Sequence, residues 1–423
     1  MRIDFQAARV IRRAAATFFV WVLAVGYPAL SAADAPANPQ LSNWVRHALA
    51  ESPDVQAAQA AVDAAQARLA GTGRPLNNPE LEIEYERSDI DFATVGVSQT
   101  LDWHDKQGAR QRIADASLVT TRTELTAARE RIASELLAAL AAYQAGQTQV
   151  ELAERQTTLL QRFSELAQRR GHAGDLGTTE VQLAQLARVE GEIAAAGHQV
   201  ALAEAHDALT RLTGTSRIPD VALPVVPAEN LPVAGSAHDL AQRSPEVRVA
   251  QAQAQAANLS VRGADLDRRA DPTIGIKGGK EDNQSLFGLN LSIPLQMRND
   301  FSAEVAAVRS ESTMAAHRLA QAERGARAQI ESAQRRYRAL RQAWQVWERA
   351  GESRLQQRLE LLEKLWRVGE LPTTDYLVQV QQTLDTESAS LTLRRDLWQS
   401  WIAWLRAAGQ VTQWLGLDSQ GDE

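Results

Sequence analysis

The chain of 423 residues contains no cysteine, and this absence removes several classes of site. Without thiols there are no disulfides, no thiolate metal ligands, no cysteine nucleophile and no N-terminal cysteine to carry a lipid anchor. The net charge of −7 leaves no basic footprint for nucleic acid. We therefore expect no nucleic-acid partner.

Histidine and methionine are scarce as well, with seven and three residues. No two histidines are spaced i, i+2 or i, i+4, and the nearest pair is His198 and His206. No nucleophile motif, glycine-rich phosphate loop or HExxH motif occurs. We expect no dedicated metal site, no cofactor and no enzymatic activity.

Long apolar runs are absent beyond the N-terminus, so no transmembrane helix is predicted there. Residues 1–33 instead have the pattern of a signal peptide. A run with four arginines precedes the apolar stretch Ala14 to Val25, which is too short to span a bilayer comfortably. Ser31-Ala32-Ala33 fits a cleavage site, with Ala35 as a near alternative. A retained anchor is the other interpretation; we expect cleavage and export.

Proline is missing between Pro79 and Pro219 and again between Pro294 and Pro372. Because proline breaks helix interiors, these gaps permit long helices. We predict them over about 107–170, 178–212, 302–367 and 373–414. A helix of about 60 residues would be roughly 90 Å long and needs a coiled-coil partner.

What the chain does contain is an internal repeat. Ser52-Pro53-Asp54-Val55 recurs as Ser244-Pro245-Glu246-Val247, and Asn78-Pro79-Glu80-Leu81 matches Asp271-Pro272-Thr273-Ile274. The glycine-containing run 174–180 matches 369–375. A shared bias toward alanine and glutamine would explain matching helices, but it would not explain these proline and glycine anchors.

The repeat divides the mature chain into a first repeat, 34–214, a Pro-rich linker, 215–236, a second repeat, 237–416, and a tail, 417–423. Each repeat starts with a helix, about 41–69 or 237–266, that can restart at its Ser-Pro pair. Two alternating segments and two long helices follow. The predicted fold class is therefore mainly α with a small β part, built from a duplicated helix, strand pair and long helical hairpin.

The alternating segments, about 79–88, 93–103, 272–280 and 285–295, predict strand pairs. In the first segment, apolar Leu81, Ile83 and Tyr85 alternate with Glu80, Glu82, Glu84 and Glu86. Each segment is near the roughly 9–11 residues of a tilted membrane strand, although a half-buried soluble sheet has the same period. The export signal and the long helices favour membrane strands. Four strands cannot close a barrel, so several subunits must pool theirs; the strand count does not choose between two and three.

The chain resembles the TolC family of outer membrane factors over essentially its whole mature length. The resemblance rests on the duplicated element order and on particular runs: the Ser-Pro-Asp/Glu-Val starts, Gly96-Val97-Ser98-Gln99-Thr100-Leu101, Leu291-Ser292-Ile293-Pro294-Leu295 and the two glycine turns. It implies a homotrimer with a twelve-stranded outer-membrane β-barrel continued by a periplasmic α-helical barrel. It also implies docking to an inner-membrane RND pump through a periplasmic adaptor, a membrane fusion protein.

Within that family the chain is most similar to the CzcC-type branch, which serves heavy-metal cation exporters. Asn78-Pro79-Glu80-Leu81 and Gln99-Thr100-Leu101-Asp102-Trp103 carry this similarity. His104-Asp105 stands where the branch usually has glycines, and Pro294-Leu295-Gln296 departs from its usual Pro-Leu-Pro-like run. The resemblance implies a passive outer-membrane efflux channel, with multidrug or siderophore export as the alternative to metal cations. A soluble periplasmic coiled-coil scaffold is the rival outside the channels.

The two glycine turns are the principal candidate site. Gly174 and Gly369 can take the left-handed conformation that ends a helix. The resemblance places the periplasmic tip and the adaptor contact at these turns, and the expected contact residues are Gly174, Asp175, Leu176, Thr178, Gly369, Glu370, Leu371 and Thr373. A plain helix-hairpin turn would need the same glycines.

Acidic residues at two places suggest a path for cations. Glu180, Glu370 and Asp375 form a candidate acidic gate beside the turns, because acidic rings favour cations in pores. Acids that complement a helix N-terminus have the same placement. Glu80, Glu82, Glu84 and Glu86 would line the barrel lumen, or simply form a solvated polar face. For the tryptophans of the second helix pair we expect helix packing.

Overall fold

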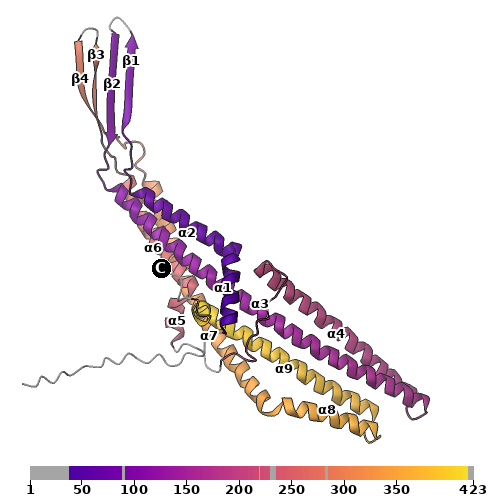
Figure 1. Ribbon diagram of the computed structural model, residues 1–423. Helices are drawn as coiled ribbons and strands as arrows, with labels where there is room; N and C mark the ends of the chain where they lie inside the picture. Colours follow the sequence, from indigo (N-terminus) through magenta and orange to yellow (C-terminus); the bar gives the residue numbers. More distant parts are fainter. Residues whose placement is uncertain (1–37, 88–90, 219, 229–234, 282–283, 418–423) are drawn as a thin grey trace, which may run out of the picture. The chain divides into compact units, whose positions relative to one another are not determined.

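The computed structural model describes residues 38–87, 91–218, 220–228, 235–281 and 284–417. The predicted signal peptide, 1–33, and the tail after Leu417 lie outside the described residues. The fold is mainly α with one small sheet, as predicted (Figure 1). Over the stretches that the structure describes, none of the helices combines the length and the apolar character needed to cross a bilayer.

The described residues of the first repeat form four helices and two strands. Its elements are α1 (Pro39–Glu51), α2 (Pro53–Thr72), β1 (Glu80–Arg87), β2 (Asp91–Thr100), α3 (Lys106–His172) and α4 (Thr178–Thr213). The second repeat follows the same order as α5 (Ala237–Arg243), α6 (Pro245–Asp267), β3 (Thr273–Glu281), β4 (Gln284–Ser292), α7 (Ser302–Ala350), α8 (Glu352–Arg367), α9 (Thr373–Ala408) and α10 (Val411–Trp414). The element order predicted from the sequence is therefore present in both repeats.

The Ser-Pro pairs interrupt the first helix of each repeat. Ser52 and Ser244 are extended, with ψ of 122° and 143°, because a residue before proline is kept out of the helical region. The buried Ser244 hydroxyl accepts a hydrogen bond from the Val247 N–H (3.3 Å) and so caps α6.

The predicted helix over 302–367 is interrupted, which the sequence pattern did not indicate. It breaks at Gly351, where the ring of Trp347 occupies the space that a Cβ would need. The predicted helix over 373–414 also ends early, at Ala408. Gly409 has φ of +65° and terminates α9, and the short α10 restarts from Val411.

The four strands form one antiparallel sheet in the order β1-β2-β3-β4 (Figure 1). The central pair joins the two repeats, with Val97 opposite Ile276. Strands β1 and β4 are the edges, so each has one side without a strand partner in this chain. The sheet therefore depends on both repeats.

The helices share a core centred on α3 and α9. Leu136 and Leu137 of α3 and Trp401 and Trp404 of α9 are fully buried in it. The buried carboxylate of Glu130 on α3 accepts hydrogen bonds from the backbone N–H groups of Val411 and Thr412 at the start of α10. A buried charge is thereby satisfied by a helix N-terminus.

The described part of the linker is bonded to these helices. The Gln144 side chain donates to the Val221 carbonyl (2.6 Å) and accepts from the Leu223 N–H (3.2 Å). Trp398 Nε1 donates to the Pro224 carbonyl (3.1 Å). Side chains from both repeats thus supply hydrogen-bond partners to backbone groups of a segment that has no regular secondary structure.

Candidate functional site

The sheet has an exposed apolar face. The register aligns Leu81 with Val97, Val97 with Ile276, and Ile276 with Leu289, so apolar side chains form continuous rows across all four strands. Leu289 is 80% exposed, whereas Thr94 and Ser98 on the opposite face of β2 are each only 4% exposed. A soluble half-buried sheet would show the reverse pattern.

The polar face carries acids at one edge. Glu80, Glu82 and Glu84 of β1 lie opposite Ser98, Gly96 and Thr94 of β2. Further along these rows the face contains Lys277 of β3 and several glycines. The glutamates predicted to share one face do so, and all four are exposed. Sequence analysis did not identify Lys277 as part of this face. Its position beside the glutamates depends on how β3 pairs with β2, and the sequence of either strand alone does not give that register.

A charged cluster fixes the junction between sheet and helices. Lys106 Nζ lies 2.9 Å from one carboxylate oxygen of Asp271, and His104 Nδ1 lies 3.3 Å from the other. The Lys106 and Gln107 N–H groups donate to the Asp102 carboxylate at 2.7 and 2.8 Å, which caps α3. Burial alone would raise the pKa of Asp271, but the hydrogen bonds from Lys106 and His104 outweigh it and lower that pKa below its ordinary value.

The two glycine turns have the same backbone geometry. Gly174 has φ of +82° and Gly369 has φ of +83°. The N–H of the next residue reaches back to the helix in both turns, from Asp175 to the Arg170 carbonyl (2.8 Å) and from Glu370 to the Leu365 carbonyl (3.0 Å). The left-handed helix ends predicted from the sequence are confirmed, and they repeat in both hairpins.

An aromatic cluster joins the two hairpins next to these turns. The rings of Phe163, Trp366 and Tyr376 lie 4.5 to 5.1 Å apart, and all three side chains are buried. Arg170 of α3 lies over the Trp366 ring and donates to the carbonyls of Trp366 and Arg367 at the end of α8, both at 3.2 Å. Burial raises the pKa of Tyr376 to about 12, and the Glu363 carboxylate adds to the shift. We call these four residues the hairpin clamp.

Three of the expected contact residues belong to the inside of the tip. Thr373 is 2% exposed and accepts a hydrogen bond from Trp366 Nε1 (3.2 Å). Leu176 and Leu371 are half-buried against the aromatic cluster. Asp175, Thr178 and Glu370 are exposed, as a contact surface requires. The sequence pattern alone did not separate these two groups.

The acids of the candidate gate differ in their surroundings. Glu180 accepts a hydrogen bond from the Gly177 N–H (3.0 Å) and so caps α4. Such a contact with a helix N-terminus is the alternative to a role in the gate. Glu370 and Asp375 are exposed. The structure therefore ties Glu180 to its own helix and leaves the other two side chains open to solvent.

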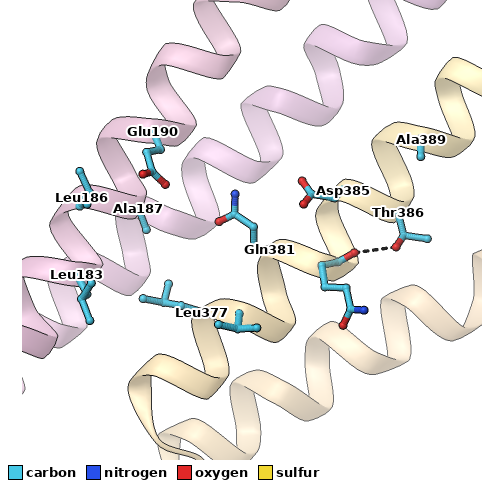
Figure 2. A pocket seen from close by; sticks show the side chains of 11 residues that line it. Leu183, Leu186, Ala187, Glu190, Leu377, Gln381, Asp385, Thr386 and Ala389 are labelled. Carbon is cyan, nitrogen blue, oxygen red and sulfur yellow. Dashed lines mark hydrogen bonds between the residues drawn. The ribbon is translucent and has the colours of Figure 1, made fainter.

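A groove of about 820 Å³ lies between α4 and α9. Figure 2 shows Leu183, Leu186 and Glu190 on one side of it and Gln381 and Asp385 on the other. Sequence reasoning missed Glu190 and Asp385, since neither is part of a motif and their proximity depends on how the two hairpins pack.

Helix α4 also presents an exposed apolar stripe. Leu186, Val189, Ile193 and Val200 follow one another at spacings of three, four and seven residues, and their side chains are 39% to 68% exposed. This is the heptad pattern of a coiled-coil seam. Within the described chain the seam has no helix packed over it at these residues.

Comparison with known families gives a match to the model described as Outer membrane efflux protein, over residues 44–215. This segment belongs to that family. The match spans the first repeat from α1 to the end of α4, and it confirms the family predicted from the sequence; the CzcC-type branch stays a prediction. A search of curated protein sequences found no significant match.

Solved structures extend the likeness to both repeats of this efflux-family fold. The chain is similar to VceC from Vibrio cholerae, with 18% identity, a TM-score of 0.71 and coverage of 88% of this chain and 96% of that one. It is similar to CusC, with 17% identity, a TM-score of 0.73 and coverage of 88% and 92%. For CmeC from Campylobacter jejuni the identity is 13%, the TM-score 0.73 and the coverage 95% and 94%. VceC is an outer membrane protein, and CmeC is an outer membrane channel.

Proposed function

We propose that this chain is one subunit of a trimeric outer-membrane channel that passively conducts substrate from the periplasm to the exterior. The observation that carries the proposal is the reversed burial of the sheet, in which the apolar rows are exposed whereas Thr94 and Ser98, on the opposite polar face of β2, are buried. Such a sheet is stable when its apolar face meets lipid and its polar face meets water.

The unpaired edges support assembly into a closed ring. An open sheet edge in lipid would leave backbone groups without partners. Because β1 and β4 are the two edges of an antiparallel sheet, β4 of one subunit can pair with β1 of the next in the same antiparallel sense. Three subunits would then supply twelve strands, and the apolar stripe on α4 would be covered by a helix of a neighbouring subunit.

The turns are proposed as the docking end for the rest of a tripartite pump. Exposed Asp175, Thr178 and Glu370 would contact a periplasmic adaptor, and an inner-membrane RND pump would provide the energy. Glu370 and Asp375, each repeated around a threefold axis, would favour cations at the entrance. The hairpin clamp would keep the two turns of one subunit in register.

Heavy-metal cations are the proposed substrate class. The carboxylates Glu80, Glu82, Glu84 and Glu86 on the polar face of β1 support it, since acidic linings favour cations. The resemblance to the CzcC-type branch supports it as well. Export of drugs or other small molecules by a duct of the same family is the second candidate, favoured by the apolar residues Leu183 and Leu186 along the α4–α9 groove.

Two measurements test the proposal in order. Membrane fractionation and a heat-modifiable mobility assay should find the protein in the outer membrane as a trimer; a monomer extracted without detergent would favour the soluble scaffold. A deletion strain should then lose tolerance to one or more divalent metals, and restoring the gene should bring that tolerance back. Lost tolerance to drugs or dyes with unchanged metal tolerance would select the second candidate.

A further inference from the structure

Lys277 is an isolated cation on the polar face of the sheet. Its row contains Glu82 of β1, Gly96 of β2 and Gly288 of β4. Among the residues that the structure describes, Lys277 has neither a hydrogen bond nor an ion pair, and the same holds for Glu82 and Glu84. The row therefore holds two unpaired charges of opposite sign, Glu82 and Lys277, and Gly96 separates them.

The lysine side chain leans toward the free edge of β4. Its Cγ and Cε lie 3.3 and 3.6 Å from the position that a Cβ would take at Gly288, so the aliphatic stem crosses the glycine. On its other side, the Lys277 atoms nearest to the corresponding position at Gly96 are the Cβ and Cα, at 3.1 and 3.6 Å. The ammonium group is thus directed away from Glu82 of its own chain. A side chain at position 288 would obstruct this path.

We propose that Lys277 forms an ion pair with a β1 glutamate, Glu82 or Glu84, of the adjacent subunit. This inference rests on the proposed trimer, in which β4 of one subunit pairs with β1 of the next. Lys277 then lies two strands from the neighbour's glutamates, a separation of about 10 Å. The stretched lysine side chain covers most of that separation and the glutamate side chain covers the rest.

Charge complementarity identifies the occupant of this edge. The polar face carries four carboxylates on one edge strand and a lysine reaching toward the other edge. A closed ring of such sheets brings each lysine to the acids of the next subunit, whereas an isolated subunit leaves both sets unpaired. The pair would fix the register of the seam that hydrogen bonds alone leave free to slip.

Cross-linking between differently substituted subunits tests the placement. The natural absence of cysteine makes introduced thiols unique. A chain with Lys277→Cys is expressed together with a chain carrying Glu82→Cys or Glu84→Cys, and the cells are treated with a bismaleimide that spans about two strand spacings, roughly 10 Å. We expect a product of two joined chains on a denaturing gel. Lys280→Cys is the matched control, because Lys280 lies on the apolar face opposite Ala93, and it should give no product.

Charge reversal tests the pairing itself. Lys277→Glu should lower the temperature at which the trimer dissociates by about 2–4 °C, and adding Glu82→Lys or Glu84→Lys should restore it. Lys280→Glu is the control. If this change lowers the dissociation temperature, adding Glu82→Lys or Glu84→Lys should not restore it. Intact trimers without the cross-linked product, or without rescue by either reversal, would overturn the inference; absence of trimers from the unmodified chain would instead count against the proposed function.

Discussion

Gly174 and Gly369 carry the geometry of the two turns because each has φ above +80°. Only glycine takes this conformation without steric cost, since a Cβ meets the following carbonyl. Neither glycine has a neighbouring atom within 4 Å of the position that a Cβ would take. The requirement at both positions is therefore conformational, and a larger residue would not be excluded by lack of space.

Replacing Gly369 with alanine should lower the free energy of unfolding by about 1–2 kcal/mol. Gly325, which lies within α7 and also has open space around it, is the matched control. Alanine there should stabilise the helix by up to about 1 kcal/mol. Thermal denaturation followed by far-ultraviolet circular dichroism measures both changes, and an equal response of the two variants would contradict the conformational argument.

Asp271 makes the junction of sheet and helices sensitive to pH. Its pKa is lowered in the folded state, since the hydrogen bonds from Lys106 and His104 outweigh the effect of burial. A lowered pKa means that the carboxylate stabilises the fold above the unfolded value of about 3.9 and loses this contribution as pH falls through the folded value. We therefore expect Asp271→Asn to lower the unfolding temperature most at neutral pH.

The difference between the wild type and Asp271→Asn should shrink as the pH falls below about 4. Asp267→Asn provides the comparison, because Asp267 is half-exposed and its ion pair with Arg110 is long, at 3.7 Å. The measurement is the unfolding temperature of the wild type and of both variants over a pH series. A constant difference at every pH would show that Asp271 acts through packing and not through its charge.

At the scale of elements, the hairpin clamp determines how the two hairpins meet. Arg170 connects the first hairpin to the last carbonyls of α8, where a cation also complements the helix dipole. Trp366 is held in turn by Thr373 at the start of α9. Three helix ends thus converge on one buried aromatic cluster.

Arg170→Ala should therefore destabilise the tip by about 1.5–3 kcal/mol, the usual cost of losing hydrogen bonds from a charged donor. The adjacent Arg169 is exposed, and Arg169→Ala should have little effect. For each variant, limited proteolysis measures how readily the turns open, and thermal melting measures the loss of overall stability. If the turns of both variants are cleaved at the same rate, Arg170 does not hold the hairpins together.

The elements differ in how far the sequence predicted them. The Ser-Pro restarts and the two left-handed glycines follow from rules that act over a few residues, and the structure has them as expected. The break at Gly351 depends on where the Trp347 ring packs, and the inward position of Thr373 depends on Trp366 from another helix. The groove acids Glu190 and Asp385 are brought together only by the packing of two hairpins. Such features have no local signature.

At the scale of the whole molecule, the exposed apolar rows require a surrounding that is not water. Leu289→Arg places a charge in these rows and should cost about 2–4 kcal/mol if the site lies near the bilayer midplane. Asn290→Arg, one residue further on the polar face, should be tolerated. Recovery of heat-resistant trimer from the outer membrane measures the difference. Equal recovery of both variants would show that the apolar rows do not face lipid.

The pairing of β2 with β3 also determines when the sheet can form. These strands are separated by all the long helices of the first repeat and by the linker, so a chain emerging from the export machinery first offers only the β1–β2 hairpin. A two-stranded hairpin is marginally stable in water. Insertion into the membrane must therefore wait until most of the polypeptide has been translocated. During that interval the nascent apolar segments need protection by periplasmic chaperones, and depletion of these factors should reduce assembly of this protein more than that of soluble helical proteins.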